Sequence, residues 1–297
     1  MLKSTGLLSE VVAWLESESA IKAAILFGSS VRASSGTDRP DNWADIDLHI
    51  ITTSACSLES VNWSRVLPRE KFCLQIVRPA TGGVRKVTVL FASGQIDLVL
   101  VPASQIYLAR IAMWLGLHRR SYRLLVALNE VHTCLQSGYR FLKGEKAWGA
   151  FYSRIMTELP GVRLSDREVF NLAAVFLCEL LLVLKKLERG ELAAAQYALH
   201  RSLAETNFRL IRELRLRRGQ PLPSFGLARH VETSLSASEL AWVEIDARLD
   251  REGLRRATLR SFTGLKALME QLVPEWSVPT AVSELLGLYL VGPKQDS

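Results

Sequence analysis

The sequence of 297 residues predicts an α+β protein with two parts. A mixed β-sheet with flanking helices is expected over residues 1–110, and an all-helical domain over residues 111–297. Two observations predict this division. Short apolar runs separated by glycine-containing turns fill the first hundred residues, and beyond Pro102 the apolar residues recur at helical spacing without a convincing strand. The hydrophobic content of 48% is enough for a sizeable core.

The first part alternates strands with short helices in the order α-β-β-α-β-β-β. Leu7, Val11 and Leu15 recur at helical spacing, whereas each strand is an apolar run that ends at a turn. The expected elements are a helix at 5–17, strands at 21–27 and 47–51, a helix at 57–67, and strands at 72–77, 84–91 and 95–101. This order fits a small mixed sheet covered by helices.

The second part reads as helices only. Ser165 and Glu168 form a capping box that starts one helix, and Gly190 and Gly219 follow two helical patterns as stop signals. The expected helices span 104–117, 122–136, 148–158, 165–189, 191–218, 238–249 and 252–272. The tail after Val273 has no clear pattern.

Composition excludes several classes of protein. No apolar stretch approaches the roughly 18 unbroken residues of a membrane span, and no secretory leader is evident, so we expect no membrane association and a cytoplasmic location. The four cysteines lack metal-binding spacing, which argues against a zinc site or a disulfide framework. Cys73 and Cys178 lie in apolar runs, and we expect both to be buried.

The net charge of +7 is uneven along the chain. Residues 1–110 carry 11 basic and 10 acidic residues, whereas residues 111–297 carry 26 and 20. A basic surplus favours nucleic acid or a polyphosphate ligand, although it is also typical of a solvated surface. Charge alone therefore leaves the partner open.

Two aspartates at the start of one strand need an explanation. Asp45 and Asp47 are two residues apart, so a strand would point both to one face, where like charges repel. A cation between them would offset that repulsion. Mg²⁺ prefers hard oxygen ligands and often takes one or two carboxylates together with substrate phosphates, and a pair of ions can clamp a phosphoryl displacement.

Two further features complete this constellation. Gly28 and Ser29 form a turn after the preceding strand, where a backbone without a side chain can approach a phosphate and a hydroxyl can bind it. Asp97 is another acid within an apolar strand. If its strand lies beside that of Asp47, the three acids converge, and Asp97 can serve as general base or as third metal ligand.

The ordered set resembles the polymerase-beta-like nucleotidyltransferase superfamily. More closely, it is similar to the aminoglycoside 6-adenylyltransferase family, also called streptomycin adenylyltransferases. Three segments carry the resemblance, namely Ile25-Leu-Phe-Gly-Ser-Ser30, Asp45-Ile-Asp-Leu-His-Ile50 and the longer segment from Val89 to Pro102 around Ile-Asp-Leu. In the helical part, the segment from Leu187 to Leu192 resembles a family stretch more weakly, and a family lysine falls on Lys185.

The resemblance implies an enzyme that transfers AMP from ATP to a hydroxyl group and releases pyrophosphate. Asp45 and Asp47 would hold two Mg²⁺ ions, and Asp97 would be base or third ligand. Gly28 and Ser29 would bind phosphate, and Lys185 would reach the triphosphate unless it is a plain surface lysine. Arg32 would supply the charge that the family has directly after Gly-Ser, but only through a shifted loop.

Some features depart from the family pattern and leave the acceptor open. The loop over residues 30–44 is longer than usual, and a cationic aminoglycoside needs acidic walls, for which Glu179 is one candidate in a basic domain. The small-molecule acceptor is therefore the first hypothesis. Transfer to tRNA or protein is the alternative, and a non-catalytic nucleotide-binding module is a third.

Other conspicuous residues have ordinary structural interpretations. We expect His49 to point away from Asp47 and to be packed or hydrogen-bonded, not a ligand. The arginines over residues 212–218 are expected to be a solvated helix end, with contact to triphosphate or RNA as the alternative. Trp148, Trp242 and Trp276 are expected to anchor helix packing.

Overall fold

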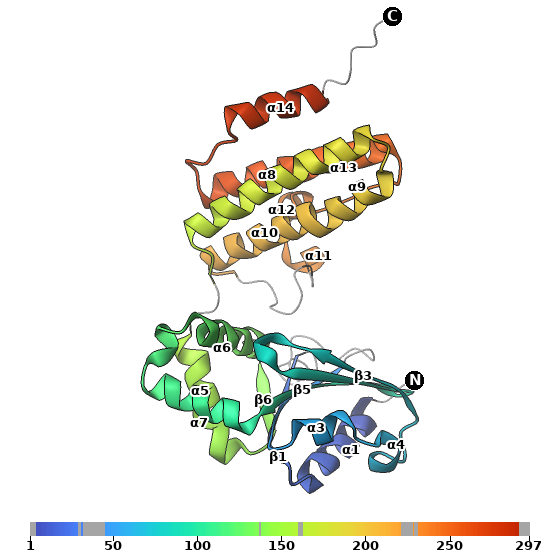
Figure 1. Ribbon diagram of the computed structural model, residues 1–297, viewed down its shortest axis with the longest axis vertical. Helices are drawn as coiled ribbons and strands as arrows, with labels where there is room; N and C mark the ends of the chain where they lie inside the picture. Colours follow the sequence, from blue (N-terminus) through green and yellow to red (C-terminus); the bar gives the residue numbers. More distant parts are fainter. Residues whose placement is uncertain are drawn as a thin grey trace, which may run out of the picture. The chain divides into compact units, whose positions relative to one another are not determined.

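The computed structural model describes residues 4–28, 31, 45–136, 138–159, 163–220, 228 and 231–290. The chain divides into two compact units, one from Met1 to Val162 and one from Arg163 to Ser297 (Figure 1). A mixed sheet with helices in the first unit and helices alone in the second confirm the predicted α+β class.

The first unit is built on a six-stranded sheet. Its strand order is β3-β4-β5-β2-β1-β6, and β2 and β5 run parallel while the other neighbours are antiparallel. The strands are β1 (Ile21–Phe27), β2 (Ile46–Thr52), β3 (Phe72–Pro79), β4 (Arg85–Phe91), β5 (Gly94–Pro102) and β6 (Tyr139–Lys143). The helices are α1 (Ser4–Ser17), α3 (Ala55–Glu59), α4 (Trp63–Val66), α5 (Ala103–Trp114), α6 (Tyr122–Leu135) and α7 (Glu145–Glu158).

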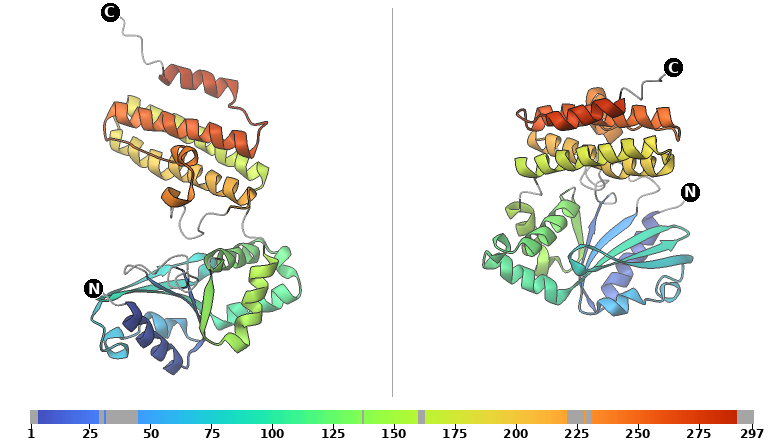
Figure 2. Two further views of the ribbon diagram at one scale, coloured as in Figure 1. Left: turned by 180° about the vertical axis from the view of Figure 1, so that it is seen from behind. Right: turned by 45° about the horizontal axis from the view of Figure 1, so that its top comes forward.

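One face of this sheet is closed by helices. Alternate residues of the central strands, such as Leu48, Leu98 and Val87, pack with Leu15 of α1 and Trp63 of α4 in one apolar cluster. Figures 1 and 2 show α1, α3 and α4 gathered on this side. Because strand side chains alternate, the residues between these core positions point to the opposite face. That second face carries the polar residues described below.

The strand β6 was not expected. Residues 139–143 come directly after a predicted helix and form only a short segment. They nevertheless pair antiparallel with β1, with Ile25 opposite Phe141. Gly144 ends the strand with φ +79°, and a Cβ there would lie 2.4 Å from the Lys22 carbonyl oxygen. The first unit therefore continues past residue 110, the expected boundary, because its sheet is completed by a strand that follows two helices.

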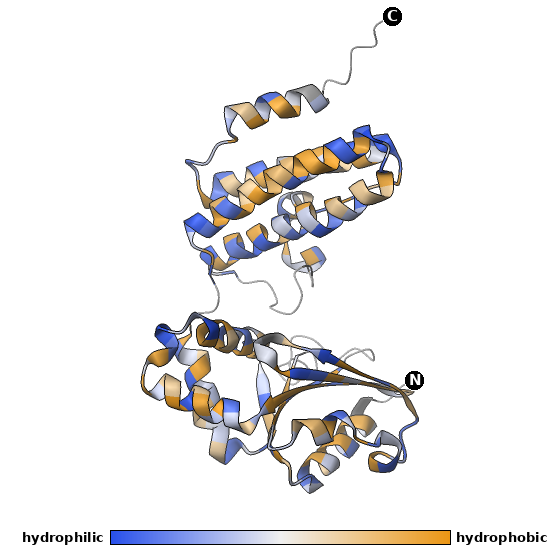
Figure 3. Cartoon of the chain, viewed as in Figure 1, coloured by the Kyte–Doolittle hydropathy of each residue, from blue (hydrophilic) through white to orange (hydrophobic). Residues whose placement is uncertain are grey.

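The second unit consists of helices around one apolar core. Its helices are α8 (Asp166–Glu188), α9 (Leu192–Ala198), a π-helical segment Leu199–Ala204, α10 (Glu205–Arg217), α11 (Val231–Ser234), α12 (Ala237–Ala241), α13 (Arg251–Leu272) and α14 (Thr280–Leu290). Figure 3 shows hydrophobic and hydrophilic residues on the same turns of these helices, as expected where one face is buried. The capping box of Ser165 and Glu168 is confirmed.

Several predicted boundaries were wrong for local reasons. The helix expected at 57–67 is two short helices, because Asn62 caps a new helix by accepting a hydrogen bond from the Arg65 amide. The helix expected at 238–249 ends at Ala241. The tail after Val273 contains α14, which lies beyond the turn at Pro274.

The cysteines are free thiols, as expected, but two of them are placed differently from the prediction. Cys73 lies on the edge strand β3 and Cys178 on the outer side of α8, and both are exposed. Their apolar sequence surroundings belong to elements with one uncovered side. Within the described residues, no helix is long and apolar enough to cross a membrane.

Candidate active site

Two acids lie side by side at the centre of the sheet. Asp47 of β2 is directly opposite Asp97 of β5 in the parallel register, and Phe27 of β1 lies opposite Asp47 on its other side. Asp97 is buried and Asp47 is half-buried. Because paired residues in neighbouring strands share a face, both carboxylates emerge on the face away from the helices α1, α3 and α4.

Gly28 leaves the space that the Asp47 carboxylate occupies. It follows β1 with φ +79°, a conformation that favours glycine, and a Cβ built on it would lie 2.5 Å from Asp47 Oδ2. Any side chain here would displace that carboxylate. The glycine is therefore required by the Asp47 carboxylate beside it as well as by the turn.

Asp45 lies one residue before β2 and is half-buried. It is thus next to the strand end where Asp47 and Asp97 meet. The structure brings Asp47, Asp97 and Gly28 together at one end of the parallel strand pair, with Asp45 adjoining them in the chain.

Asp97 is held by partners from its own sheet. Its Oδ2 accepts a charged hydrogen bond from Lys86 Nζ at 2.6 Å, and its Oδ1 accepts a longer one from Gln95 Nε2 at 3.3 Å. The Lys86 side chain is 27% exposed and that of Asp97 is 8% exposed. A mostly buried carboxylate requires such a counter-charge, because the ionised form loses hydration on burial.

A second cation lies on the neighbouring strand. Arg78 of β3 is opposite Lys86 of β4, and its Nη2 donates to the Thr88 hydroxyl at 3.0 Å. Thr88 is in turn opposite Asp97. The face therefore changes from acidic on β2 and β5 to basic on β4 and β3, a gradient that suits a ligand with a metal-bound end and an anionic end.

The helix α6 brings further ionisable groups into this neighbourhood. Burial raises the pKa of the Cys134 thiol to about 11, the carboxylates of Glu130 and Asp47 add to the rise, and Lys86 opposes it. Cys134 is thus a neutral thiol near the acids. Sequence reasoning predicted the helix α6 itself but not its place beside the acids, and it missed Lys86 and Arg78. The hairpin pattern contained the signal for Lys86, because the register of β4 against β5 fixes which residues share a face with Asp97.

The carboxylates fit a Mg²⁺ ion bound together with phosphate better than a cage made of protein alone. Among the described residues, no group of three or more His, Cys, Asp or Glu side chains gathers closely enough to hold a metal. Asp45 and Asp47 lie at one end of β2, and Gly28 leaves open backbone beside Asp47. This matches the pattern in which Mg²⁺ takes one or two carboxylates and substrate oxygens.

The structure does not place three of the predicted phosphate-binding residues in the site. Ser29 and Arg32, with the loop over residues 30–44 except Val31, lie outside the described residues. Lys185 is exposed on α8 in the second unit. Their roles remain predictions from the resemblance.

His49 corrects one expectation and confirms another. It comes two residues after Asp47, so strand alternation places it on the same face, not away from it. It is buried, and its Nε2 lies 3.0 Å from the Tyr152 hydroxyl of α7, so it is a hydrogen-bonded histidine as expected. Burial lowers the pKa of His49 to about 4, which keeps the ring neutral at pH 7.

The arginines at the end of α10 serve packing within the second unit. Arg217 pairs with Glu213 and Asp166 at 2.9 Å each, while Arg215 and Arg218 pair with Glu239. Arg215 and Arg217 are half-buried and are therefore not the solvated helix end expected from the sequence, whereas Arg218 is exposed. Burial of Trp148 and the packing of Trp242 and Trp276 against the core confirm their anchoring role.

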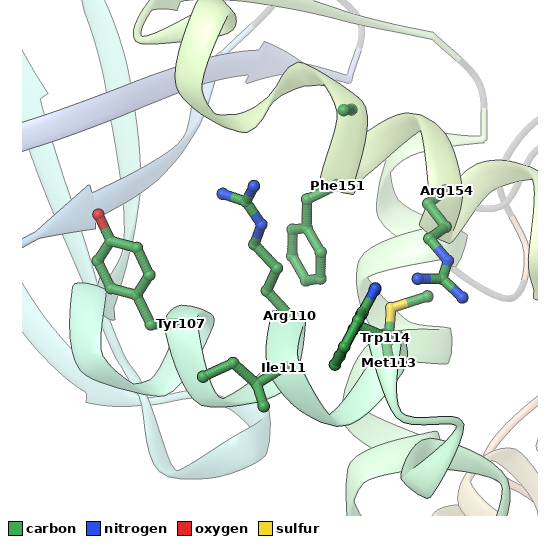
Figure 4. A pocket seen from close by; sticks show the side chains of 8 residues that line it. Tyr107, Arg110, Ile111, Met113, Trp114, Phe151 and Arg154 are labelled. Carbon is green, nitrogen blue, oxygen red and sulfur yellow. The ribbon is translucent and has the colours of Figure 1, made fainter.

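A separate hollow of about 480 Å³ lies between α5 and α7 (Figure 4). Arg110 and Trp114 of α5 face Phe151 and Arg154 of α7 across it. The residues that line it are Tyr107, Arg110, Ile111, Met113, Trp114, Ala150, Phe151 and Arg154. They include no carboxylate, so the chemistry of paired acids belongs to the sheet face and not to this hollow.

No protein-family model and no curated protein sequence matches this chain. Among solved structures, the crystal structure of an aminoglycoside 6-adenyltransferase from Bacillus subtilis is similar over 98% of each chain, with 11% identity and a TM-score of 0.40. A nucleotidyltransferase-like protein from Exiguobacterium sibiricum 255-15 is similar over 90% of this chain and 75% of its own, with 13% identity and a TM-score of 0.31. These two proteins are structural neighbours of this chain.

Proposed function

We propose that this protein is a Mg²⁺-dependent nucleotidyltransferase that transfers AMP from ATP to a hydroxyl group of a small, aminoglycoside-like acceptor. One observation carries the proposal. Asp47 and Asp97 are adjacent on parallel strands, beside a glycine whose missing side chain accommodates the Asp47 carboxylate. The segments around these residues are also the ones that resemble the aminoglycoside 6-adenylyltransferases.

Asp45 and Asp47 would hold the Mg²⁺, and Asp97 would act as general base or third ligand. The bound cation would stabilise negative charge on the transferring phosphoryl group. Lys86 and Arg78 would attract the phosphates from the basic side of the face. Gly28 would leave the backbone accessible to a phosphate oxygen. Ser29, Arg32 and Lys185 are proposed as further phosphate contacts.

The proposed reaction is an in-line displacement. The acceptor hydroxyl oxygen forms a bond to the α-phosphorus of ATP, and the bond from that phosphorus to the bridging oxygen of the β-phosphate breaks. Pyrophosphate leaves with the electron pair. The hydroxyl proton passes to the Asp97 carboxylate when that residue acts as base, which requires only hydrogen-bond reach.

The test is incubation of the purified chain with ATP labelled at the α-phosphate, Mg²⁺ and separate acceptors. We expect label on an aminoglycoside and release of pyrophosphate. Label on tRNA or on protein instead would replace the small-molecule acceptor with a macromolecular one. Absence of Mg²⁺-dependent nucleotide binding would contradict a nucleotidyltransferase and a nucleotide-binding module alike.

A further inference from the structure

The ion pair between Lys86 and Asp97 has a consequence for metal binding. The Lys86 ammonium lies 2.6 Å from Asp97 Oδ2, and Gln95 donates to Oδ1. Both carboxylate oxygens therefore already accept hydrogen bonds from the sheet. A divalent cation bound at Oδ2 would have to share that oxygen with the ammonium, and the two positive charges repel each other at such short range.

Lys86 is able to leave this position. Its ammonium is a compact charge on a flexible four-carbon stem, and the side chain is 27% exposed. Asp97 is not mobile in the same way, since its side chain is 8% exposed and its strand is bonded on both sides. Movement of Lys86 alone is thus enough to expose the carboxylate to another cation.

An anionic ligand would draw Lys86 away. Arg78 lies opposite Lys86 on β3 and is held by its hydrogen bond to Thr88, so two cations from adjacent strands lie next to Asp97. The facing ionisable groups from α6 are Glu130 and the neutral thiol of Cys134. A triphosphate would be attracted to the two cations and would offer Lys86 a new set of acceptor oxygens.

We propose that Lys86 and a second divalent cation compete for Asp97. The protein without nucleotide then binds one cation, at Asp45 and Asp47. It binds the second only when nucleotide phosphates take over the Lys86 ammonium. Lys86 is in this sense a positioning residue that delays completion of the metal site until substrate is present. The inference rests on the proposed function, because it assumes that the two aspartates bind a divalent cation.

Mn²⁺ binding to the full chain tests this competition, with free Mn²⁺ counted by electron paramagnetic resonance. We expect one ion per wild-type chain without nucleotide and two with a non-hydrolysable ATP analogue. Lys86→Met should bind two without nucleotide, with the second at least about tenfold tighter than in wild type. Lys86→Arg, which can keep the pair, should bind one.

Two variants show whether the effect passes through Asp97. The double variant Lys86→Met/Asp97→Asn should bind one ion, because the freed carboxylate is removed. Arg85→Met is the matched control. It removes one positive charge at the next residue of β4, where Arg85 pairs with Glu59 on the other face, and the count should stay at one.

Two results overturn the inference, namely two ions on the nucleotide-free wild-type chain or a single ion on folded Lys86→Met. If Lys86→Met does not fold, the wild-type counts and Asp97→Asn decide together. The wild-type count must rise from one to two with nucleotide, and Asp97→Asn must keep it at one. No Mn²⁺ on the wild-type chain in either condition contradicts the proposed function as well, whereas AMP transfer by a protein that already holds two ions contradicts only the competition.

Discussion

The two units bury acids in different ways. Asp97 in the first unit is held by one ammonium and one long hydrogen bond. In the second unit, Glu213 accepts from the Leu164 amide and from Arg217, both at 2.9 Å. Glu239 accepts from the Ser236 amide and pairs with two arginines. The buried acids of the second unit thus accept hydrogen bonds from backbone amides and guanidinium groups.

The difference separates acids that hold helices together from an acid that can change partners. Guanidinium groups present several donors in a rigid geometry, and a backbone amide cannot leave its helix end. A single lysine ammonium on a flexible stem is easier to replace. Rigid hydrogen bonds to an acid suit a core, whereas an exchangeable ion pair suits a site that must bind successive ligands. We therefore expect substitutions in the first unit to affect mainly activity and those in the second unit to affect mainly stability.

The largest effect should come from the double substitution Asp45→Asn/Asp47→Asn. Loss of both charges removes the proposed Mg²⁺ ligands, and we expect AMP transfer to fall by at least about 1,000-fold. The melting temperature should be unchanged or slightly higher, because the two like charges no longer repel each other. Rates with labelled ATP and melting curves measure the two outcomes. Retained turnover would remove these residues from the chemistry.

Glu213→Ala should have the opposite profile. It removes one of the two carboxylate partners of Arg217 and leaves the Leu164 amide without an acceptor, which should destabilise the second unit by about 2 kcal/mol. Chemical denaturation measures this loss. Turnover per folded molecule should be unchanged when assayed well below the melting temperature. A fall in turnover without a loss of stability would place Glu213 in the site.

Acidification should weaken the first unit before the second. Burial lowers the pKa of His49 to about 4, so below pH 6.5 the unfolded chain takes up a proton that the folded chain refuses. The neutral His49 ring therefore makes its full contribution to the free energy of unfolding above pH 6.5. As the pH falls towards 4, this contribution declines by up to about 3 kcal/mol. His49→Gln, which does not titrate, should remove this decline.

The second unit should resist acid over that range. Burial alone would raise the pKa of Glu239, but hydrogen bonds from Ser236 and the charges of Arg215 and Arg218 outweigh it and hold the pKa below its usual value. This contribution is complete above about pH 4.5 and is lost only below it. Hydrogen exchange measured by peptide between pH 7 and 4.5 should show opening of β2 and α7 before α8 and α13. Simultaneous opening would contradict this order.

Gly28→Ala tests the close approach of Gly28 to Asp47. The positive φ is strained for alanine and should destabilise the first unit by about 1–2 kcal/mol. The new methyl group would displace Asp47 Oδ2, which should lower turnover by about 100-fold. Gly83→Ala is the control, since it has a similar φ of +75° with open space around it. It should lose similar stability and little turnover.

The sequence predicted the fold where local pattern and packing agree. β1 was predicted at its observed bounds, because its residues, Lys22 excepted, form an apolar run that is buried on both faces of the sheet. β6 was missed because its five residues have no pattern of their own and depend on pairing with β1. Residues 199–204 continue a helix whose change to π-helical bonding has no signal in spacing alone.

The same distinction applies to the candidate site. Acids within apolar strands are conspicuous in a sequence, so Asp47 and Asp97 were selected, whereas their adjacency was only a condition that the strand pairing now meets. Lys86 was not found, because a lysine on an exposed-looking strand is ordinary until the register places it against Asp97. Arg217 was assigned to solvent because its partners, Glu213 excepted, come from other helices or from segments far away in sequence.

The smallest effect should come from Tyr152→Phe. This substitution removes only the hydroxyl that lies 3.0 Å from His49 Nε2 and keeps the ring contacts with Phe141 and Phe151. We expect a loss of about 1 kcal/mol in the free energy of unfolding, the ordinary value of one buried hydrogen bond. Turnover should be unchanged. His49 lies on the same face as Asp47, but its side chain packs against α7 and is hydrogen-bonded there, so it takes no part in the proposed chemistry. A large loss of turnover in this variant, with stability intact, would move His49 from the packing of the first unit into its chemistry.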